Sequence, residues 1–178
     1  DPNNDDAYKA MVFLYGQMKN DDKVRQLLLE RASTGPSPEK RAEALVILAS
    51  KHWQCSYDIT EQKENKTTEN TPDKVIVHFK KPANQADFDK ANTCATEGLK
   101  LAEQAVSLDQ NNANAWTQKA NLLREKAKLA EMDGNTQAKD EFENQAKSAR
   151  ETQSKLAQEA QKKKEAEEAA KSPTPPAS

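Results

Sequence analysis

The chain has 178 residues, enough for a domain with its own core, and its composition is strongly polar. Apolar residues make up 35% and charged residues 31%, so part of the chain must be solvated and not packed. The formal charge of −2 offers no overall attraction to nucleic acid, and no apolar run approaches the roughly 20 residues that cross a bilayer. The four glycines form no phosphate-binding loop. We therefore expect no nucleic-acid partner, no membrane span and no cofactor.

Apolar residues recur at spacings of three and four over residues 5–18 and again over 22–34, which predicts two helices joined by a short turn. The second helix is expected to end at Gly35, because Gly can take a left-handed cap and the following proline cannot continue the helix. Ser37 is then a natural N-cap for a third helix that begins with Pro38. The apolar face of this third helix is expected to include Leu45, Ala49, Trp53 and Tyr57.

The stretch 105–123 joins two helices in the same way. An apolar helix end at 105–108 runs into the turn-forming residues 109–112, and a new helix follows with Trp116 near its start. The chain begins with a similar joint, in which residues 1–4 precede Tyr8. Repeated joints of this kind indicate a chain built from helix-turn-helix units.

The spacing resembles that of tetratricopeptide repeats (TPR), which carry W-x2-L-G-x2-Y, then A-x3-F, then P, at a period near 34. The first-helix positions are filled by Tyr8, Met11, Val12 and Tyr15, then by Ala42, Leu45, Val46 and Ala49, and then by Trp116, Lys119, Ala120 and Leu123. The A-x3-F positions are filled by Val24 and Leu28, and later by Ala138 and Phe142. The resemblance is to TPR proteins of the bacterial type. It implies an all-α fold in which about three TPR-like repeats form a right-handed solenoid over residues 1–146.

The second repeat contains an insertion. Trp116 lies 74 residues after Ala42, which is one period of 34 plus 40. Part of the surplus extends the two helices, and residues of about 60–84 remain as a polar connection between them. Within it, residues 75–79 (Val-Ile-Val-His-Phe) have strand propensity but no obvious partner strand. We expect a loop segment that lies on the helices, with a short hairpin as the alternative.

The end of the chain is rich in Ala, Gln, Glu and Lys. Alternating charges at a spacing of four favour a solvated helix, so residues 147–171 are expected to extend the last helix into solvent. The row consists of Glu143, Lys147, Glu151, Lys155, Glu159, Lys163, Glu167 and Lys171. Residues 172–178 are Pro-rich and are expected to be a disordered tail.

The soft ligands of the chain, His52, Cys55, His78 and Cys94, all lie in or beside the insertion. In the register implied by the repeats, Val46 lies near Gly98, and the two cysteines are then offset by roughly 7 Å along the helix axis. That offset is at the edge of what a disulfide tolerates. Three alternatives stay open: two separate buried thiols, a Cys55–Cys94 disulfide, and a zinc site formed by all four residues. A disulfide would favour a periplasmic or extracellular location over a cytoplasmic one.

No recognisable nucleophile motif or acid–base pair is present, so we expect neither catalytic residues nor enzyme activity. The glycosylation pattern at Asn65 is short enough to arise by chance. The TPR resemblance implies a scaffold or adaptor that binds a protein or peptide on the concave face of its first helices. The residues expected on that face are Lys9, Phe13, Thr117, Asn121 and Arg124. The alternative function is a structural subunit that assembles with itself by stacking repeats. For Phe13 alone, the alternative is that it packs against a repeat that precedes residue 1.

Overall fold

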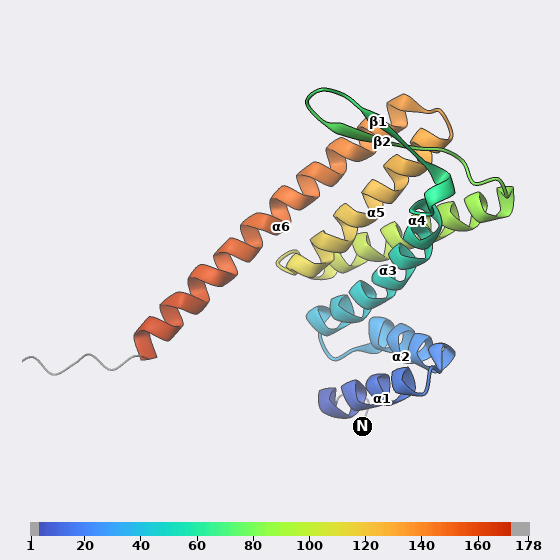
Figure 1. Ribbon diagram of the computed structural model, residues 1–178. Helices are drawn as coiled ribbons and strands as arrows, with labels where there is room; N and C mark the ends of the chain where they lie inside the picture. The colour runs from blue at the N-terminus through green and yellow to red at the C-terminus, as the bar shows by residue number, and fades with distance from the viewer. Residues whose placement is uncertain (1–3, 172–178) are drawn as a thin grey trace, which may run out of the picture.

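The computed structural model describes residues 4–171, and within them the chain forms six α-helices and one hairpin (Figure 1). The elements are α1 (Asp5–Gln17), α2 (Asp21–Thr34), α3 (Pro38–Thr60), a 3-10 turn (Lys63–Asn65), β1 (Lys66–Asn70), β2 (Val75–Phe79), α4 (Gln85–Leu108), α5 (Ala113–Met132) and α6 (Thr136–Lys171). The chain is therefore mainly helical, which confirms the all-α prediction. None of the described helices is long and apolar enough to cross a membrane, in agreement with the prediction of no membrane span.

Each described helix begins at a residue whose side-chain oxygen accepts a hydrogen bond from a backbone N–H of the first turn. Such caps satisfy donors that have no partner within the helix. The capping residues are Asn4, Asn20, Ser37, Asn84, Asn112 and Asn135. The predicted cap at Ser37, with Pro38 as the first helical residue, is confirmed.

The predicted left-handed cap at Gly35 is wrong, because Gly35 has a φ of −56°. Glycine is needed at this position for space: a Cβ atom would lie only 2.5 Å from the carbonyl oxygen of Arg31. Among the described glycines the left-handed conformation is found at Gly134, which has a φ of +73° and follows the end of α5; Lys19, after α1, also has a positive φ of 53°. Gly134 therefore reverses the chain between α5 and α6.

Helices α3 and α4 pack antiparallel along a row of small, fully buried residues. A Cβ atom added to Gly98 would lie 2.8 Å from Cβ of His52 and 2.7 Å from Cδ2 of Leu122, so α3, α4 and α5 all meet closely at this glycine. Gly98 thus opposes His52, and the predicted register that placed it near Val46 is wrong. The close fit of small residues sets the register. These residues are Ala42, Ala49, Ala91, Ala95, Ala102 and Ala105.

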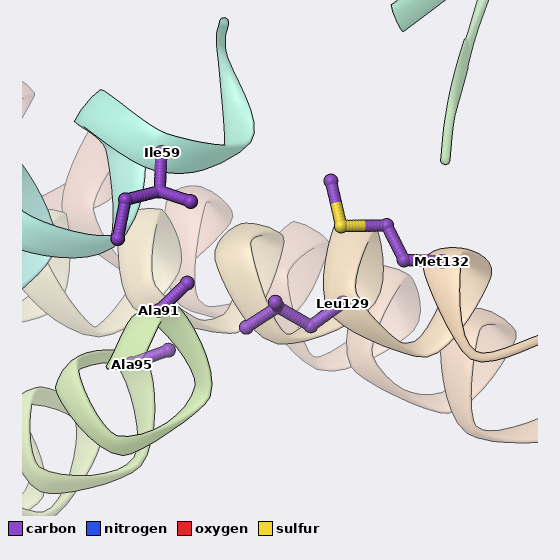
Figure 2. Close-up of a cluster of buried hydrophobic side chains, with 5 residues drawn as sticks. All are labelled: Ile59, Ala91, Ala95, Leu129 and Met132. Atoms are coloured by element: carbon purple, nitrogen blue, oxygen red, sulfur yellow. The ribbon is translucent and has the colours of Figure 1, made fainter. Parts of the chain in front are cut away.

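A second cluster joins the far ends of the same three helices. Figure 2 shows Ile59 of α3, Ala91 and Ala95 of α4, and Leu129 of α5 gathered around one point, with Met132 beside them. Phe79, the last residue of β2, packs against this cluster. The insertion between α3 and α4 is therefore anchored in the core at one end.

The expectation that residues 75–79 form a loop segment is wrong, and the alternative of a short hairpin is confirmed, because they pair antiparallel with β1 in two strands. Lys66 is opposite Phe79, and Asn70 is opposite Val75. The partner strand is polar (Lys-Thr-Thr-Glu-Asn) and mostly exposed, so it has no apolar alternation that would reveal it in the sequence. The side-chain amide of Asn65 is buried and donates to the carbonyl oxygen of Ile59 at 2.8 Å, so this asparagine has a structural role.

The two ends of the helical array differ from its middle. Helix α1 has no buried residue. Helix α6 packs on α5 through Ala146 and Ala149 and then leaves the body of the molecule, with every residue from 157 to 170 exposed (Figure 1). The expected Pro-rich tail at 172–178, and residues 1–3 of the first joint, lie outside the described residues.

Candidate functional site

A groove of about 630 Å³ lies along α5, with α3 and α6 at its sides and the hairpin at one end. We call it the α5 groove. Each surrounding element contributes to its lining: Trp53, Tyr57 and Glu61 from α3, Ile76, Val77 and Phe79 from β2, Asn121, Arg124, Glu125, Ala127, Lys128 and Glu131 from α5, and Lys139 and Glu143 from α6. Aromatic, aliphatic and charged groups therefore meet in one concave surface.

One wall of the α5 groove is aromatic. Trp53 and Tyr57 are four residues apart on α3, and their ring centroids are 5.0 Å apart. The ammonium group of Lys128 lies 5.0 Å from the ring centroid of Tyr57 and 5.1 Å from that of Phe79, within cation–π range. Tyr57 keeps 37% of its surface exposed. Ring surface is thus available to a bound molecule.

The base of the groove contains a buried, fully bonded carboxylate. Glu125 of α5 is 1% exposed, and its Oε2 accepts hydrogen bonds from Thr60 Oγ1 at 2.7 Å and Ser56 Oγ at 3.3 Å. Its Oε1 lies 2.6 Å from Nζ of Lys128. A buried charge is tolerated when its hydrogen-bonding capacity is used in this way. Glu125 therefore ties α5 to α3 and supports the aromatic wall.

A second carboxylate, Glu61, links this base to the hairpin. Its oxygens lie 2.7 Å from Nζ of Lys128 and 2.8 Å from Nζ of Lys66, the first residue of β1. Partial burial alone would raise the pKa of Glu61, but the hydrogen bonds from the two ammonium groups outweigh it and lower the pKa below the usual value. Glu61 thus stays charged and holds the start of the hairpin against the groove.

The other strand of the hairpin is held by His78. Its Nε2 lies 3.1 Å from Glu69 of β1, and its Nδ1 lies 3.3 Å from Glu131 of α5. These two carboxylates raise the pKa of His78 by favouring its protonated form. Glu131 also accepts a hydrogen bond from the backbone N–H of Phe79 and lies 2.9 Å from Nζ of Lys139. The hairpin is therefore fastened to the edge of the groove mainly by ionic contacts.

Two of the five residues expected on a binding face meet in this groove. Asn121 and Arg124 line it, and Arg124 is exposed without an ion-pair partner among residues 4–171. Thr117 lies one turn earlier on α5, and its hydroxyl donates to the carbonyl oxygen of Ala113. Lys9 and Phe13 are on α1 and do not line the groove: Lys9 pairs with Asp5 at 2.7 Å, and Phe13 is 68% exposed.

The cysteines decide between the three alternatives that the sequence left open. Cys55 and Cys94 form a disulfide, with their Cα atoms 6.0 Å apart, so the two separate thiols and the zinc site are both excluded as interpretations. The predicted 7 Å offset is wrong because the helices pair in the register set by Gly98. His52 lies 3.7 Å from Glu97. Among the described residues, no group of three or more His, Cys, Asp or Glu side chains is placed to hold a metal ion.

The residues that sequence reasoning missed are Trp53, Tyr57 and Lys128. The spacing of the two aromatic residues was interpreted only as the apolar face of α3. A signal for a site was present in the sequence: Trp53 and Tyr57 are four residues apart and lie beyond Ala49, the last of the TPR-like first-helix positions on α3. No signal of this kind marked Lys128, whose partners come from three separate elements.

No family model matches the chain, and no curated protein or solved structure matches it. Its function is therefore inferred from the groove itself.

Proposed function

We propose that this chain is an adaptor of TPR-like helical repeats that binds a protein or peptide partner in the α5 groove. In this arrangement α1, α3 and α5 are the first helices of three repeats, and the groove is the concave side at the third. Packing at the expected positions supports this assignment. Trp116 and Phe142 both pack against the cluster that contains Leu123 and Ala146, while Tyr8 packs against the cluster that contains Val24 and Leu28.

The observation that carries the proposal is Arg124, which no residue in the described part of the chain pairs with, beside an aromatic wall. Arginine, tryptophan and tyrosine are the residue types that contribute most to binding energy at protein interfaces. The other cations of the groove are already neutralised, Lys128 by Glu61 and Glu125, and Lys139 by Glu131. Arg124 is thus the cation left to pair with a partner's carboxylate.

The same pairing supports a binding role over a catalytic one. A general acid or base must be able to exchange a proton with a bound substrate. Glu61 and Glu131 instead have lowered pKa values and contact lysines, so both remain ionised and bonded within the protein near neutral pH. The carboxylates of the groove therefore hold its walls together.

The test uses peptides selected from a random dodecapeptide display library against the immobilised full chain. Arg124→Glu is expected to weaken the selected peptides by at least tenfold, measured by fluorescence anisotropy, because it reverses the exposed charge of the groove. Arg150→Glu is the matched control, since Arg150 is an exposed arginine of α6 outside the groove, and it should change affinity less than twofold. Equal effects of the two variants, or no selected peptide, would contradict the proposal.

A second candidate function is self-assembly, which the surface of α1 favours. This helix and its C-cap residue Met18 expose four large apolar side chains, and exposed apolar surface of this kind often marks an interaction site. They are Met11, Phe13, Leu14 and Met18. Light scattering over a concentration series should then show growing mass that Phe13→Asp abolishes and Ile47→Asp, at an exposed apolar residue of α3, does not. A monomer at all concentrations would exclude this candidate.

A further inference from the structure

We propose that the partner of the α5 groove binds as an extended strand that pairs with the outer edge of β2. This inference rests on the proposed function and specifies its partner class: an extended peptide segment with alternating aliphatic side chains and an acidic residue. Adding a strand to an exposed sheet edge is a common mode of peptide recognition, because the backbone supplies affinity and the side chains supply specificity.

The hairpin register determines which backbone groups of β2 are left for such pairing. Lys80 N–H donates to the carbonyl oxygen of Asn65, and Thr71 N–H donates to that of Lys74, at the two ends of the hairpin. Hydrogen-bonded pairs alternate with non-bonded pairs in an antiparallel ladder. Residues 76 and 78 therefore bond to β1, whereas the backbone groups of 75, 77 and 79 point away from it.

Part of this outer edge lies at the α5 groove and has no partner. The N–H of Phe79 donates to Oε1 of Glu131, so this end of the edge is occupied. Val77 lines the groove, and no hydrogen bond joins the outward backbone N–H of Val75 or Val77 to another described residue. Val75 is 65% exposed and Val77 is 44% exposed. Exposed β-branched residues on an unprotected strand edge are typical of a site where another strand adds.

The opposite edge of the hairpin is different in character. Thr68 is directly opposite Val77 and occupies the equivalent non-bonded position on β1. Its strand consists of Lys, Thr, Thr, Glu and Asn, and lysine and other charged residues on an edge discourage strand addition. The hairpin therefore has one apolar edge at the groove and one polar edge away from it.

The chemistry of the groove specifies the side chains of the partner. A strand paired with Val77 presents every second side chain to one face. Aliphatic groups suit the surface formed by Val77 and Tyr57, and a carboxylate suits Arg124, the unpaired cation among the described groove residues. An extended segment with aliphatic residues at alternate positions and one acidic side chain satisfies all three contacts.

The decisive variant is Val77→Pro, tested with the selected dodecapeptides in the full chain. Proline removes the outward N–H, and the hairpin does not use this N–H in its ladder, so an edge position tolerates the substitution. Thr68→Pro is the matched control, because it makes the same change on the opposite edge. We expect Val77→Pro to weaken binding at least tenfold and Thr68→Pro less than twofold. Val77→Ala, which keeps the N–H, should weaken binding less than Val77→Pro.

Amide hydrogen exchange of the wild-type chain provides a second measurement that does not depend on how the variants fold. Bound peptide should slow exchange of the Val77 N–H at least tenfold and leave Thr68 N–H unchanged. Unchanged exchange at Val77, or equal affinity loss in the two proline variants, would overturn strand addition. If Arg124→Glu still weakens binding in that case, the adaptor proposal survives. If no selected peptide depends on Arg124, the adaptor proposal is contradicted as well.

Discussion

The N-terminal pair α1–α2 and the central unit α3–α5 are both built from antiparallel helices, yet they are held together by different means. The central unit has a disulfide between Cys55 and Cys94 and a close fit of small residues around Gly98. The N-terminal pair buries no residue of α1 and depends on half-buried aromatics. It also depends on Arg31 of α2, which is 4% exposed, pairs with Asp5 and lies over the ring of Tyr8.

The comparison shows that a helix can be well formed without being firmly attached. Helix α1 has a good N-cap at Asn4 and acidic residues in its first turn, so local interactions stabilise it. Its attachment to the rest of the protein depends on a few partly buried contacts. We therefore expect α1 to open more readily than the central unit, and the groove to be supported by the more stable part of the molecule.

The largest effect is expected from Leu122→Ala in the central unit. Leu122 is fully buried and packs on Ala49 and Ala102, so truncation leaves a cavity where three helices meet. The loss should be about 3 to 5 kcal/mol of unfolding free energy in urea titrations. Leu29→Ala is the control, because Leu29 is 43% exposed on α2 and should cost less than about 1 kcal/mol. Equal losses of unfolding free energy in the two variants would contradict the role of Leu122 in the core of the central unit.

The second-largest effect is expected from removing the disulfide. It links two cysteines that are 39 positions apart in the sequence. Replacing both Cys55 and Cys94 by serine should lower the unfolding free energy by about 2 to 4 kcal/mol, because the unfolded chain gains freedom. Hydrogen exchange should accelerate in α3 and α4 while remaining unchanged in α1. A reducing agent should have no further effect on the double variant. Faster exchange in α1 would show that the regions are coupled.

A smaller effect is expected from Arg31→Ala. This substitution removes the guanidinium that pairs with Asp5 and stacks on Tyr8, which should cost about 1 to 2 kcal/mol at the attachment of α1. Amides of α1 should exchange roughly five- to thirtyfold faster while those of α4 stay the same. Lys9→Ala also removes a partner of Asp5 but from an exposed position, and it should have little effect.

The smallest effect is a pH dependence of the hairpin. The carboxylates of Glu69 and Glu131 raise the pKa of His78, so protonated His78 helps to hold the hairpin below the unfolded pKa of about 6.5. This contribution should disappear as the pH rises through the higher folded pKa. Protection factors of hairpin amides should therefore fall a few-fold over that range. His78→Gln should remove the pH dependence, and an unchanged wild-type profile would contradict this role.

Much of the local structure was predictable, because helices are determined by nearby residues. The spacing of apolar residues and the cap at Ser37 located the helical segments correctly. The hairpin was given only as the alternative because its first strand is polar on both faces, and because contacts with distant residues, such as the His78–Glu131 pair, hold it in place. Gly35 was misinterpreted because a glycine required for space cannot be distinguished in sequence from one required for a left-handed turn.

Part of the candidate site was also within reach of the sequence. Asn121 and Arg124 were placed on a binding face by counting along the third repeat, and both line the α5 groove. Trp53 and Tyr57 were assigned to a helix face but not to a site. The groove has walls from α3, β2 and α6, and no spacing along the chain relates these elements to one another.

The sequence by itself determined the helical class, the helix starts and the solvated character of the last helix, since all three depend on residues within a few positions of one another. Only the tertiary structure decided the α3–α4 register, and with it the disulfide, because a register depends on which small residues fit closest between two helices. It also decided the placement of the hairpin at the groove. Ion pairs with distant residues of α5 hold it there: Glu131 pairs with His78, and Lys128 pairs with Glu61, which also pairs with Lys66 at the start of the hairpin.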